Sequence, residues 1–293
     1  MTAPRRVSEP WELLQSHSFA LINRSKLLPQ AWHEKLPLLA LRHSRIGGSP
    51  ERLPALLALQ PGAPYMEALA QNLEMSQEQP ELRTLCALFS LAEDIEPEPL
   101  RAHLSERLVA HLASGGRAFL RYFDPSVFPK LARIIPAHRW RLLYGPIQDW
   151  TIPFQNEWIT FPAPQTDIKA GAWVLTDEQW ARVEHIRLIN QALTDYQTAQ
   201  DAPWESFEHY SQATETAERA LLTAQQHYGL QDEGDLLAYA VDALTHGEHF
   251  HLHPALQNVL RHPQGYGAAS GELDKTLWAA VKAHAHHVTI ERN

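Results

Sequence analysis

The sequence predicts a mixed protein, α+β or α/β, in which an N-terminal lobe of a small sheet with helices precedes an all-helical C-terminal lobe. Three observations support this. Short apolar runs of strand length occur at residues 19–22, 53–59 and 85–91. No strand signal of similar strength follows Phe161, and capped amphipathic helices begin near Thr176. We therefore expect residues 1–165 to form the first lobe and residues 166–293 the second.

In the first lobe, the apolar runs at 19–22, 53–59 and 85–91 are expected to be buried strands, and residues 1–12 a loose arm. Between them, residues 65–75 have the spacing of an amphipathic helix. Residues 100–112 predict a second helix, because leucines recur there at steps of four: Leu100, Leu104, Leu108 and Leu112.

Residues 115–150 carry the densest pattern of the chain. Gly115 and Gly116 are expected to end the preceding helix, after which residues 118–123 read as a strand, 126–135 as a helix and 140–144 as a strand. Such a unit predicts a βαβ arrangement. Asp124 is placed as the N-cap of the middle helix and Pro125 at its first position.

Residues 150–161 alternate only in places and are followed or interrupted by prolines. Because proline cannot donate to a ladder, Pro153 and Pro162 favour edge strands or extended loop over a central strand.

The second lobe reads as a series of helices with recognisable ends. TDEQ at residues 176–179 is a capping-box sequence that begins a helix reaching to about residue 199. Gly229 and Gly247 are placed at the C-termini of the next two helices. The remaining predicted helices cover residues 206–228, 232–245, 254–260 and 272–288.

Composition narrows the classes of function. The chain has 293 residues, of which 44% are apolar and 20% charged, as is ordinary for a globular protein. Its net charge of −9 lacks the basic footprint of a nucleic-acid binder, so we expect no nucleic-acid partner. The sequence has no membrane-length apolar window, and no apolar signal segment follows the N-terminal arginines; we expect neither a membrane partner nor secretion.

The only cysteine, Cys86, lies in the apolar run of residues 84–91. One cysteine makes neither an internal disulfide nor a thiolate cage. We expect it to pack as a small apolar side chain in a reducing compartment, the cytoplasm.

We expect no cofactor, because phosphate-binding and nucleophile motifs are absent. The glycine-rich segment at residues 265–271 follows a helix rather than a strand, and its third glycine is one place late for a dinucleotide fingerprint. It is predicted to be a plain loop.

The run LRYFDP at residues 120–125, followed by YGP at 144–146 and by Trp150, resembles the signature of the type VI secretion effector adaptors. These are the Tap or TEC chaperones, first described as a domain of unknown function. An arginine usually follows the aspartate–proline pair in that family, whereas this chain has Ser126. The resemblance covers roughly residues 17–165. The matching motif residues are Arg121, Tyr122, Asp124, Pro125, Gly145, Pro146 and Trp150.

The resemblance implies an adaptor rather than an enzyme. Family members bind a cognate toxic effector in the producing cell and help to load it onto the VgrG-type spike protein. On that view the first lobe carries the common fold, and residues 166–293 are the probable cargo-recognition region.

Four tryptophans near the junction of the lobes are candidates for partner contacts, since aromatic anchors dominate many interfaces. Core packing is the alternative for each of them. They are Trp150, Trp158, Trp173 and Trp204.

Arg121 shares the predicted strand face of Phe119 and Phe123, so its guanidinium is expected to be partly buried and to need a carboxylate. Asp124 is the nearest one in sequence. We expect the pair to fix the strand-to-helix corner; a general acid or base site is the alternative.

The histidine-rich segment His246-Gly-Glu-His249-Phe-His251-Leu-His253 is the main alternative source of chemistry, because imidazole is a common metal ligand. It does not have the H-E-x-x-H spacing of helical zinc sites. With seventeen histidines in the chain, a hydrogen-bonded turn explains the cluster equally simply. A metal-dependent or hydrolase-like enzyme, and an immunity protein that neutralises a toxin, are therefore retained as alternative functions.

Overall fold

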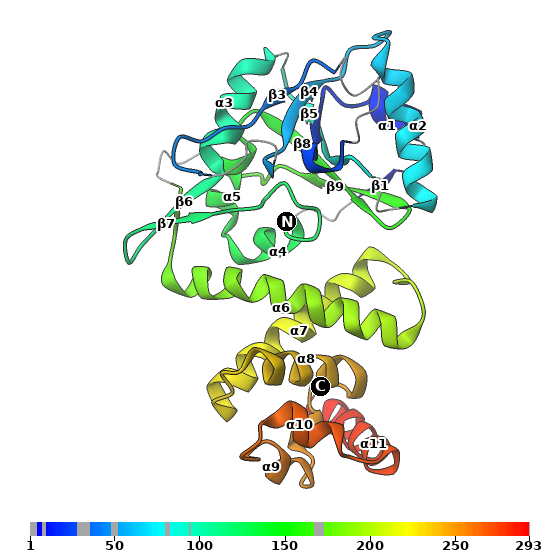
Figure 1. Ribbon diagram of the computed structural model, residues 1–293, viewed down its shortest axis with the longest axis vertical. Helices are drawn as coiled ribbons and strands as arrows, with labels where there is room; N and C mark the ends of the chain where they lie inside the picture. Colours follow the sequence, from blue (N-terminus) through cyan, green and yellow to red (C-terminus); the bar gives the residue numbers. More distant parts are fainter. Residues whose placement is uncertain are drawn as a thin grey trace. The chain divides into compact units, whose positions relative to one another are not determined.

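The chain divides into two compact units between Ala181 and Arg182 (Figure 1). The computed structural model describes residues 5–7, 10–27, 36–47, 52–79, 83–93, 95–166 and 173–292. The first unit contains the described strands and the second is helical, which confirms the mixed α+β class. We expected the first lobe to end near residue 165; the compact unit also includes β10 (Val174–Leu175) and the start of α6 (Asp177–Gln200).

Seven strands form the main sheet of the first unit, and every neighbouring pair is antiparallel. The predicted strands at 19–22, 53–59 and 85–91 all belong to it. The loose arm predicted over residues 1–12 is wrong for residues 5–7, which pair with residues 158–160, and for residues 10–12, which are helical; residues 1–4 and 8–9 lie outside the described residues. In spatial order the strands are β1 (Arg5–Val7), β9 (Glu157–Pro162), β8 (Ile147–Phe154), β5 (Leu85–Leu91), β2 (Phe19–Ile22), β4 (Ala55–Ala58) and β3 (Leu39–Ala40).

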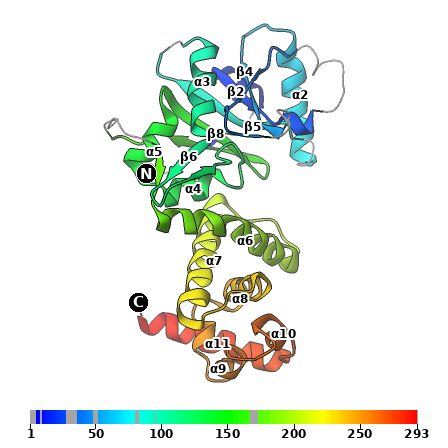
Figure 2. The same ribbon diagram turned by 60° about the vertical axis from the view of Figure 1, so that its left-hand side comes forward.

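Helices cover both faces of this sheet. On one face α1 (Pro10–Gln15) and α2 (Tyr65–Glu78) pack Leu14 and Leu69 against Ile22 and Leu88. On the other face Phe128 of α4 (Phe128–Ile134) stacks on Trp150 of β8. Figure 2 shows α2 and α4 on opposite sides of the strands. Because neither face meets water, β2 and β5 are continuous apolar runs rather than alternating ones.

β8 and β9 form a hairpin inside the sheet, so the predicted edge position of residues 150–161 is wrong. Pro153 is tolerated because the pairing of β8 with β5 ends at Thr151. Beyond that point only β9 pairs with β8, through Trp158 opposite Pro153.

A second sheet of three strands, in the order β10-β6-β7, completes the first unit. The predicted helix over 100–112 is too long: α3 (Pro97–Arg107) ends before β6 (Val109–Leu112), which pairs antiparallel with β7 (Arg117–Phe119). The prediction is too long because steps of four continue past the end of the helix: Leu100 and Leu104 lie in α3, whereas Leu112 lies in β6. Gly115 and Gly116 have φ of 99° and 87° and form the turn between β6 and β7 instead of ending a helix.

The predicted βαβ unit is also wrong. Residues 140–144 lie in α5 (Ala137–Tyr144), whose buried Trp140, Leu143 and Tyr144 have helical i, i+3, i+4 spacing. A five-residue apolar run does not distinguish a helix from a strand. The strand predicted over 118–123 ends at Phe119, and α4 begins after Val127, so neither Asp124 nor Pro125 has its predicted capping position.

Helices with well-defined ends make up the second unit, as predicted. α7 and α8 contact each other, and α10 packs on α8. The segment 265–271 is a short helix rather than the predicted loop. After α6 the elements are α7 (Phe207–Tyr228), α8 (Glu233–His246), the 3-10 turn η5 (Phe250–Leu252), α9 (Leu256–Val259), α10 (Tyr266–Gly271) and α11 (Lys275–Arg292). A further 3-10 turn, η1 (Arg24–Lys26), follows β2 in the first unit.

The helix ends predicted at Thr176 and Gly229 are confirmed in atomic detail. Thr176 and Gln179 form a reciprocal capping box: the Thr176 N–H donates to Gln179 Oε1 (3.0 Å), and the Gln179 N–H donates to Thr176 Oγ1 (3.2 Å). Gly229 closes α7 with φ of 68°, a left-handed conformation that favours glycine. None of the helices that the structure describes is long and apolar enough to cross a bilayer.

Candidate functional site

Trp150 lies at the centre of an aromatic cluster that includes Tyr122 and Tyr144 of the LRYFDP and YGP runs. Its ring is fully buried, and its centroid lies 4.5 Å from that of Phe89, 4.7 Å from that of Phe128, and 5.8 Å from those of both Tyr122 and Tyr144. Tilted and edge-on pairs of this kind stabilise a core beyond the area they bury. These positions of the signature therefore specify packing.

The two tyrosines of the cluster also tie it to the backbone. The Tyr122 hydroxyl donates to the Leu104 carbonyl (2.5 Å), and the Tyr144 hydroxyl donates to the Phe161 carbonyl (2.9 Å). Burial raises the pKa of both hydroxyls, so both remain protonated donors at neutral pH. They join α3 and β9 to the aromatic cluster.

Gly145 ends α5 in a conformation that requires glycine, with φ of 53° and ψ of −115°. A Cβ at this position would also lie 2.5 Å from Cε1 of His103. The His103 ring is bonded through Nε2 to the Leu143 carbonyl (2.9 Å) and cannot easily move aside. Pro146 then prevents the helix from continuing.

Arg121 and Asp124 form an ion pair, as predicted, with Arg121 Nη2 donating to Asp124 Oδ2 (2.7 Å). The expected burial of Arg121 is wrong, since its side chain is 60% exposed. The other carboxylate oxygen, Oδ1, accepts from the Ser126 N–H (2.9 Å) and hydroxyl (2.7 Å). The two carboxylate oxygens of Asp124 therefore bind the residues on both sides of it, Arg121 and Ser126, and stabilise this turn.

A cavity of about 290 Å³ lies beside this turn and is lined by Arg121, Asp124, Arg83 and Cys86, among others. The Arg83 guanidinium donates through Nη2 to the carbonyls of Gln155 (2.7 Å) and Ser76 (3.2 Å), whereas its buried Nε has no hydrogen-bond partner among the described residues. Burial raises the pKa of the Cys86 thiol to about 12. Cys86 therefore packs as predicted, and nothing in this cavity presents an activated nucleophile.

Lys130 is a buried cation inside the apolar face of α4, a position that the sequence pattern did not predict. Its side chain is 2% exposed, and Nζ donates to the Ser126 carbonyl (3.1 Å). Burial lowers its pKa to about 7, although Asp124 opposes that shift.

All four candidate tryptophans are buried, Trp150, Trp158, Trp173 and Trp204 alike, at 9% exposure or less. They pack as core residues do, so none presents its ring at the surface of the structure. Contact with a partner stays a prediction for these four residues.

The histidine segment forms the turn η5 and its flanks. His246 stacks on Trp278, with ring centroids 4.2 Å apart, and burial lowers its pKa to about 4. His251 Nδ1 bonds to the Tyr239 hydroxyl (2.5 Å).

His253 lies edge-on to His284 of α11, so this helix approaches the histidine segment. His249 is half-buried. In the part of the chain that the structure describes, no three histidine, cysteine or acidic side chains are grouped to hold a metal ion.

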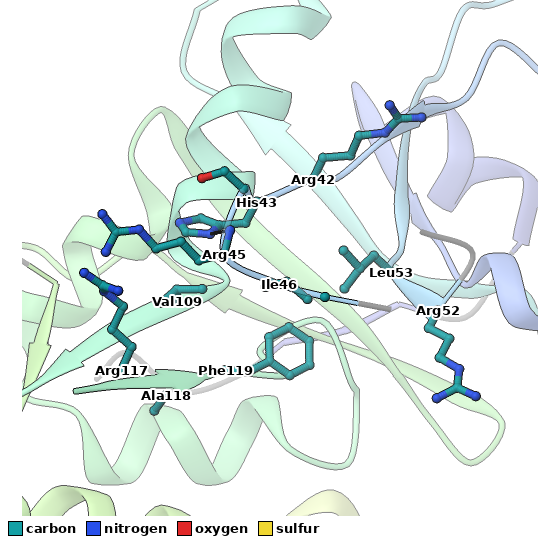
Figure 3. A pocket seen from close by; sticks show the side chains of 12 residues that line it. Arg42, His43, Arg45, Ile46, Arg52, Leu53, Val109, Arg117, Ala118 and Phe119 are labelled. Carbon is teal, nitrogen blue, oxygen red and sulfur yellow. Dashed lines mark hydrogen bonds between the residues drawn. The ribbon is translucent and has the colours of Figure 1, made fainter. Parts of the chain in front are cut away.

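A wide groove of about 790 Å³ lies between two described stretches, residues 42–47 and 52–53, and the sheet of β6 and β7 (Figure 3). Its floor is apolar and includes Phe119, which is 42% exposed although large and aromatic. Four arginines, all exposed, surround that floor. The lining residues are Arg42, His43, Ser44, Arg45, Ile46, Gly47, Arg52, Leu53, Val109, Arg117, Ala118 and Phe119.

Strand alternation and a tethered loop position the groove residues. In β7, Arg117 and Phe119 are exposed and Ala118 is buried between them, so both larger side chains lie on the groove side. Across the groove, the Arg42 N–H donates to Ser105 Oγ of α3 (3.1 Å). This bond fixes the start of the described loop that carries Arg45.

His43 organises the same loop. Its Nδ1 accepts from the Arg45 N–H (3.2 Å), and its carbonyl accepts from the Ile46 N–H (3.0 Å). His43 Nε2 lies 3.8 Å from a carboxylate oxygen of Glu106. The backbone that presents Arg45 is thus a fixed turn.

Sequence reasoning missed the groove entirely. Its arginines are scattered over residues 42–117 and form no motif. The one available signal was Phe119, which follows an arginine at the spacing that places both on one face of a strand.

Residues 30–142 match a family model described as a domain of unknown function, DUF4123. That stretch contains every residue that lines the groove, together with the LRYFDP run. Neither the curated proteins nor the solved structures contain a match to this chain.

Proposed function

We propose that this chain is a bacterial type VI secretion adaptor, which binds a cognate toxic effector in the cytoplasm of the producing cell and helps to load it onto a VgrG-type spike. It acts by binding rather than by catalysis. The observation that carries the proposal is the match of residues 30–142 to a family associated with type VI effector adaptors.

The geometry supports a binding role. The hydroxyls and carboxylates of the signature region are engaged in structural bonds: the Tyr122 and Tyr144 hydroxyls hold carbonyls, and Asp124 holds a turn. The groove instead offers an exposed aromatic ring and exposed cations, the side chains that contribute most at protein interfaces. The second unit adds recognition of the effector.

The test is affinity purification of the tagged full-length chain from its host lysate, with the bound proteins identified by mass spectrometry. We expect a toxin-like effector together with a spike protein. Chemical cross-linking of the recovered complex then assigns the effector contacts to one unit or to both.

Two results would overturn the proposal. A partner-free chain that carries one equivalent of zinc would redirect attention to His246, His249, His251 and His253. Protection of recipient cells against the toxin would instead identify an immunity protein.

A further inference from the structure

We infer that the groove between residues 42–47 and 52–53 on one side and β7 on the other binds an acidic peptide segment of a partner protein, with one large apolar side chain of that segment seated on Phe119. This inference rests on the proposed adaptor function, because it names the chemistry of the partner segment that an adaptor would capture. It concerns one surface of the first unit.

The groove is lined by positive charge although the chain as a whole is negative. The whole chain is acidic, at −9, yet four of its 25 lysines and arginines line this one groove. Such a local reversal of sign attracts anionic partners and raises their association rate. A nucleic-acid ligand is disfavoured because the rest of an acidic chain would repel an extended polyanion.

The groove arginines have free hydrogen-bonding capacity. Among the described residues, no carboxylate forms an ion pair with Arg45, Arg52 or Arg117. By contrast Arg83 and Arg121, which line the smaller cavity, are bonded to protein oxygens. A guanidinium is built to receive a carboxylate through two parallel hydrogen bonds.

The positions of the arginines and of Phe119 along the groove predict the order of acidic and apolar residues in the peptide that it binds. Figure 3 shows the guanidinium groups of Arg45 and Arg117 toward one end of the groove and that of Arg52 toward the other, with the Phe119 ring between them. Leu53 and Val109, both buried, continue the apolar floor. A segment with acidic residues on both sides of an aromatic or large aliphatic residue matches this order.

Phe119 supports a protein ligand over a small anion. It is one of three large apolar side chains that remain exposed in the described part of the chain. A phosphate or a single carboxylate gains nothing from an exposed phenyl ring, whereas an apolar side chain buries it. The groove volume of about 790 Å³ suits a few residues of an extended chain.

The test is a selection of random displayed dodecapeptides on the purified full-length chain, followed by fluorescence anisotropy with synthetic copies of the enriched peptides. We expect enriched sequences with acidic residues around one large apolar residue. Their Kd should rise about tenfold or more in Arg45→Glu and in Arg117→Glu, because an attraction becomes a repulsion.

Matched variants separate charge, hydrogen-bond geometry and apolar contact. Arg117→Lys keeps the charge but loses the planar fork, so an intermediate loss is expected. Phe119→Ala should weaken binding more than Phe119→Leu. Arg261→Glu, an exposed position in the second unit, should leave Kd unchanged and is the control for a general change in net charge.

Several outcomes overturn the inference: no enrichment, enriched peptides without an excess of acidic residues, or full binding by both glutamate variants. Tight binding of a single-stranded oligonucleotide that depends on the same arginines would assign the groove to nucleic acid instead.

A lysate experiment distinguishes this inference from the proposed function. If Arg45→Glu/Arg117→Glu recovers the identified effector and spike as well as the natural chain does, the groove assignment fails and the adaptor function stands. If the natural chain recovers neither protein but selects acidic peptides, the groove assignment stands and the adaptor function fails.

Discussion

The aromatic cluster around Trp150 and the arginine groove lie in the same unit but are built in opposite ways. In the cluster, rings are buried and both tyrosine hydroxyls have partners. In the groove, a phenyl ring is exposed, and the guanidinium groups of Arg45, Arg52 and Arg117 form no ion pair with any described residue. The contrast shows that a recognisable sequence signature can mark the scaffold, whereas the residues that line the exposed groove form no contiguous motif.

The largest effect expected from this contrast is on folding, at Trp150. Trp150→Ala empties the centre of the cluster and should lower the free energy of unfolding by about 3–5 kcal/mol. Urea denaturation followed by circular dichroism measures it. Trp150→Phe keeps a ring in the site and should cost clearly less; equal losses would contradict the assignment of this ring to the core.

Gly145→Ala tests the end of α5. The new Cβ meets the His103 ring and must adopt a conformation that only glycine tolerates, so we expect a loss of about 2–4 kcal/mol. The double variant with His103→Ala removes the steric part alone. A double variant as unstable as Gly145→Ala would assign the whole cost to the backbone.

Lys130 tests whether every polar group in the core contributes stability. Burial lowers its pKa from 10.5 to about 7, so stability should fall as the pH decreases from above about 10 to about 7 and then level off. Lys130→Met removes the buried cation and should raise stability at pH 7 by about 1–3 kcal/mol. Thermal melts at pH 7 and at pH 9 measure both effects, and an unchanged pH profile in the variant would contradict them.

Asp242 extends the comparison to the helical unit. Its carboxylate accepts from the Tyr266 hydroxyl (2.6 Å), and burial raises its pKa from 3.8 to about 6. Stability should therefore fall as the pH rises from about 4 to about 6, because ionisation is easier in the unfolded chain. Asp242→Asn keeps an acceptor for the tyrosine and should flatten this profile, with a gain near pH 7 of about 1 kcal/mol. Asp242→Ala, which loses the bond, should not show that gain.

The smallest effect on stability is expected in the groove. Arg45→Glu and Arg117→Glu change exposed side chains without an ion-pair partner among the described residues, so each should alter stability by less than about 0.5 kcal/mol. The same denaturation curves measure this. A large loss of stability in either variant would mean that the groove, like the cluster, is part of the scaffold.

The sequence predicts the elements whose signals are local and fails where tertiary pairing decides. Caps such as Thr176 with Gln179 were predictable because the bonds involve neighbours in the chain. The helix over residues 140–144 was not, because its apolar run also fits a strand and only packing against Trp150 selects the helix.

The candidate site shows the same limit. The corner pair of Arg121 and Asp124 was predictable from three residues of separation, but the exposure of Arg121 was not. The groove joins loop residues 42–47 to β7 across a long stretch of chain. Their proximity follows from the bond between Arg42 and Ser105 and from strand alternation, neither of which leaves a motif.

The burial of Cys86 has a practical consequence. This thiol is the only one in the chain, is 5% exposed, and has a pKa of about 12, so maleimide dyes should leave it unmodified while the protein is folded. The natural cysteine therefore need not be replaced before a second cysteine is introduced for site-specific labelling. A single cysteine introduced at exposed Ser44, beside Arg45, would accept one fluorophore and report occupancy of the groove directly.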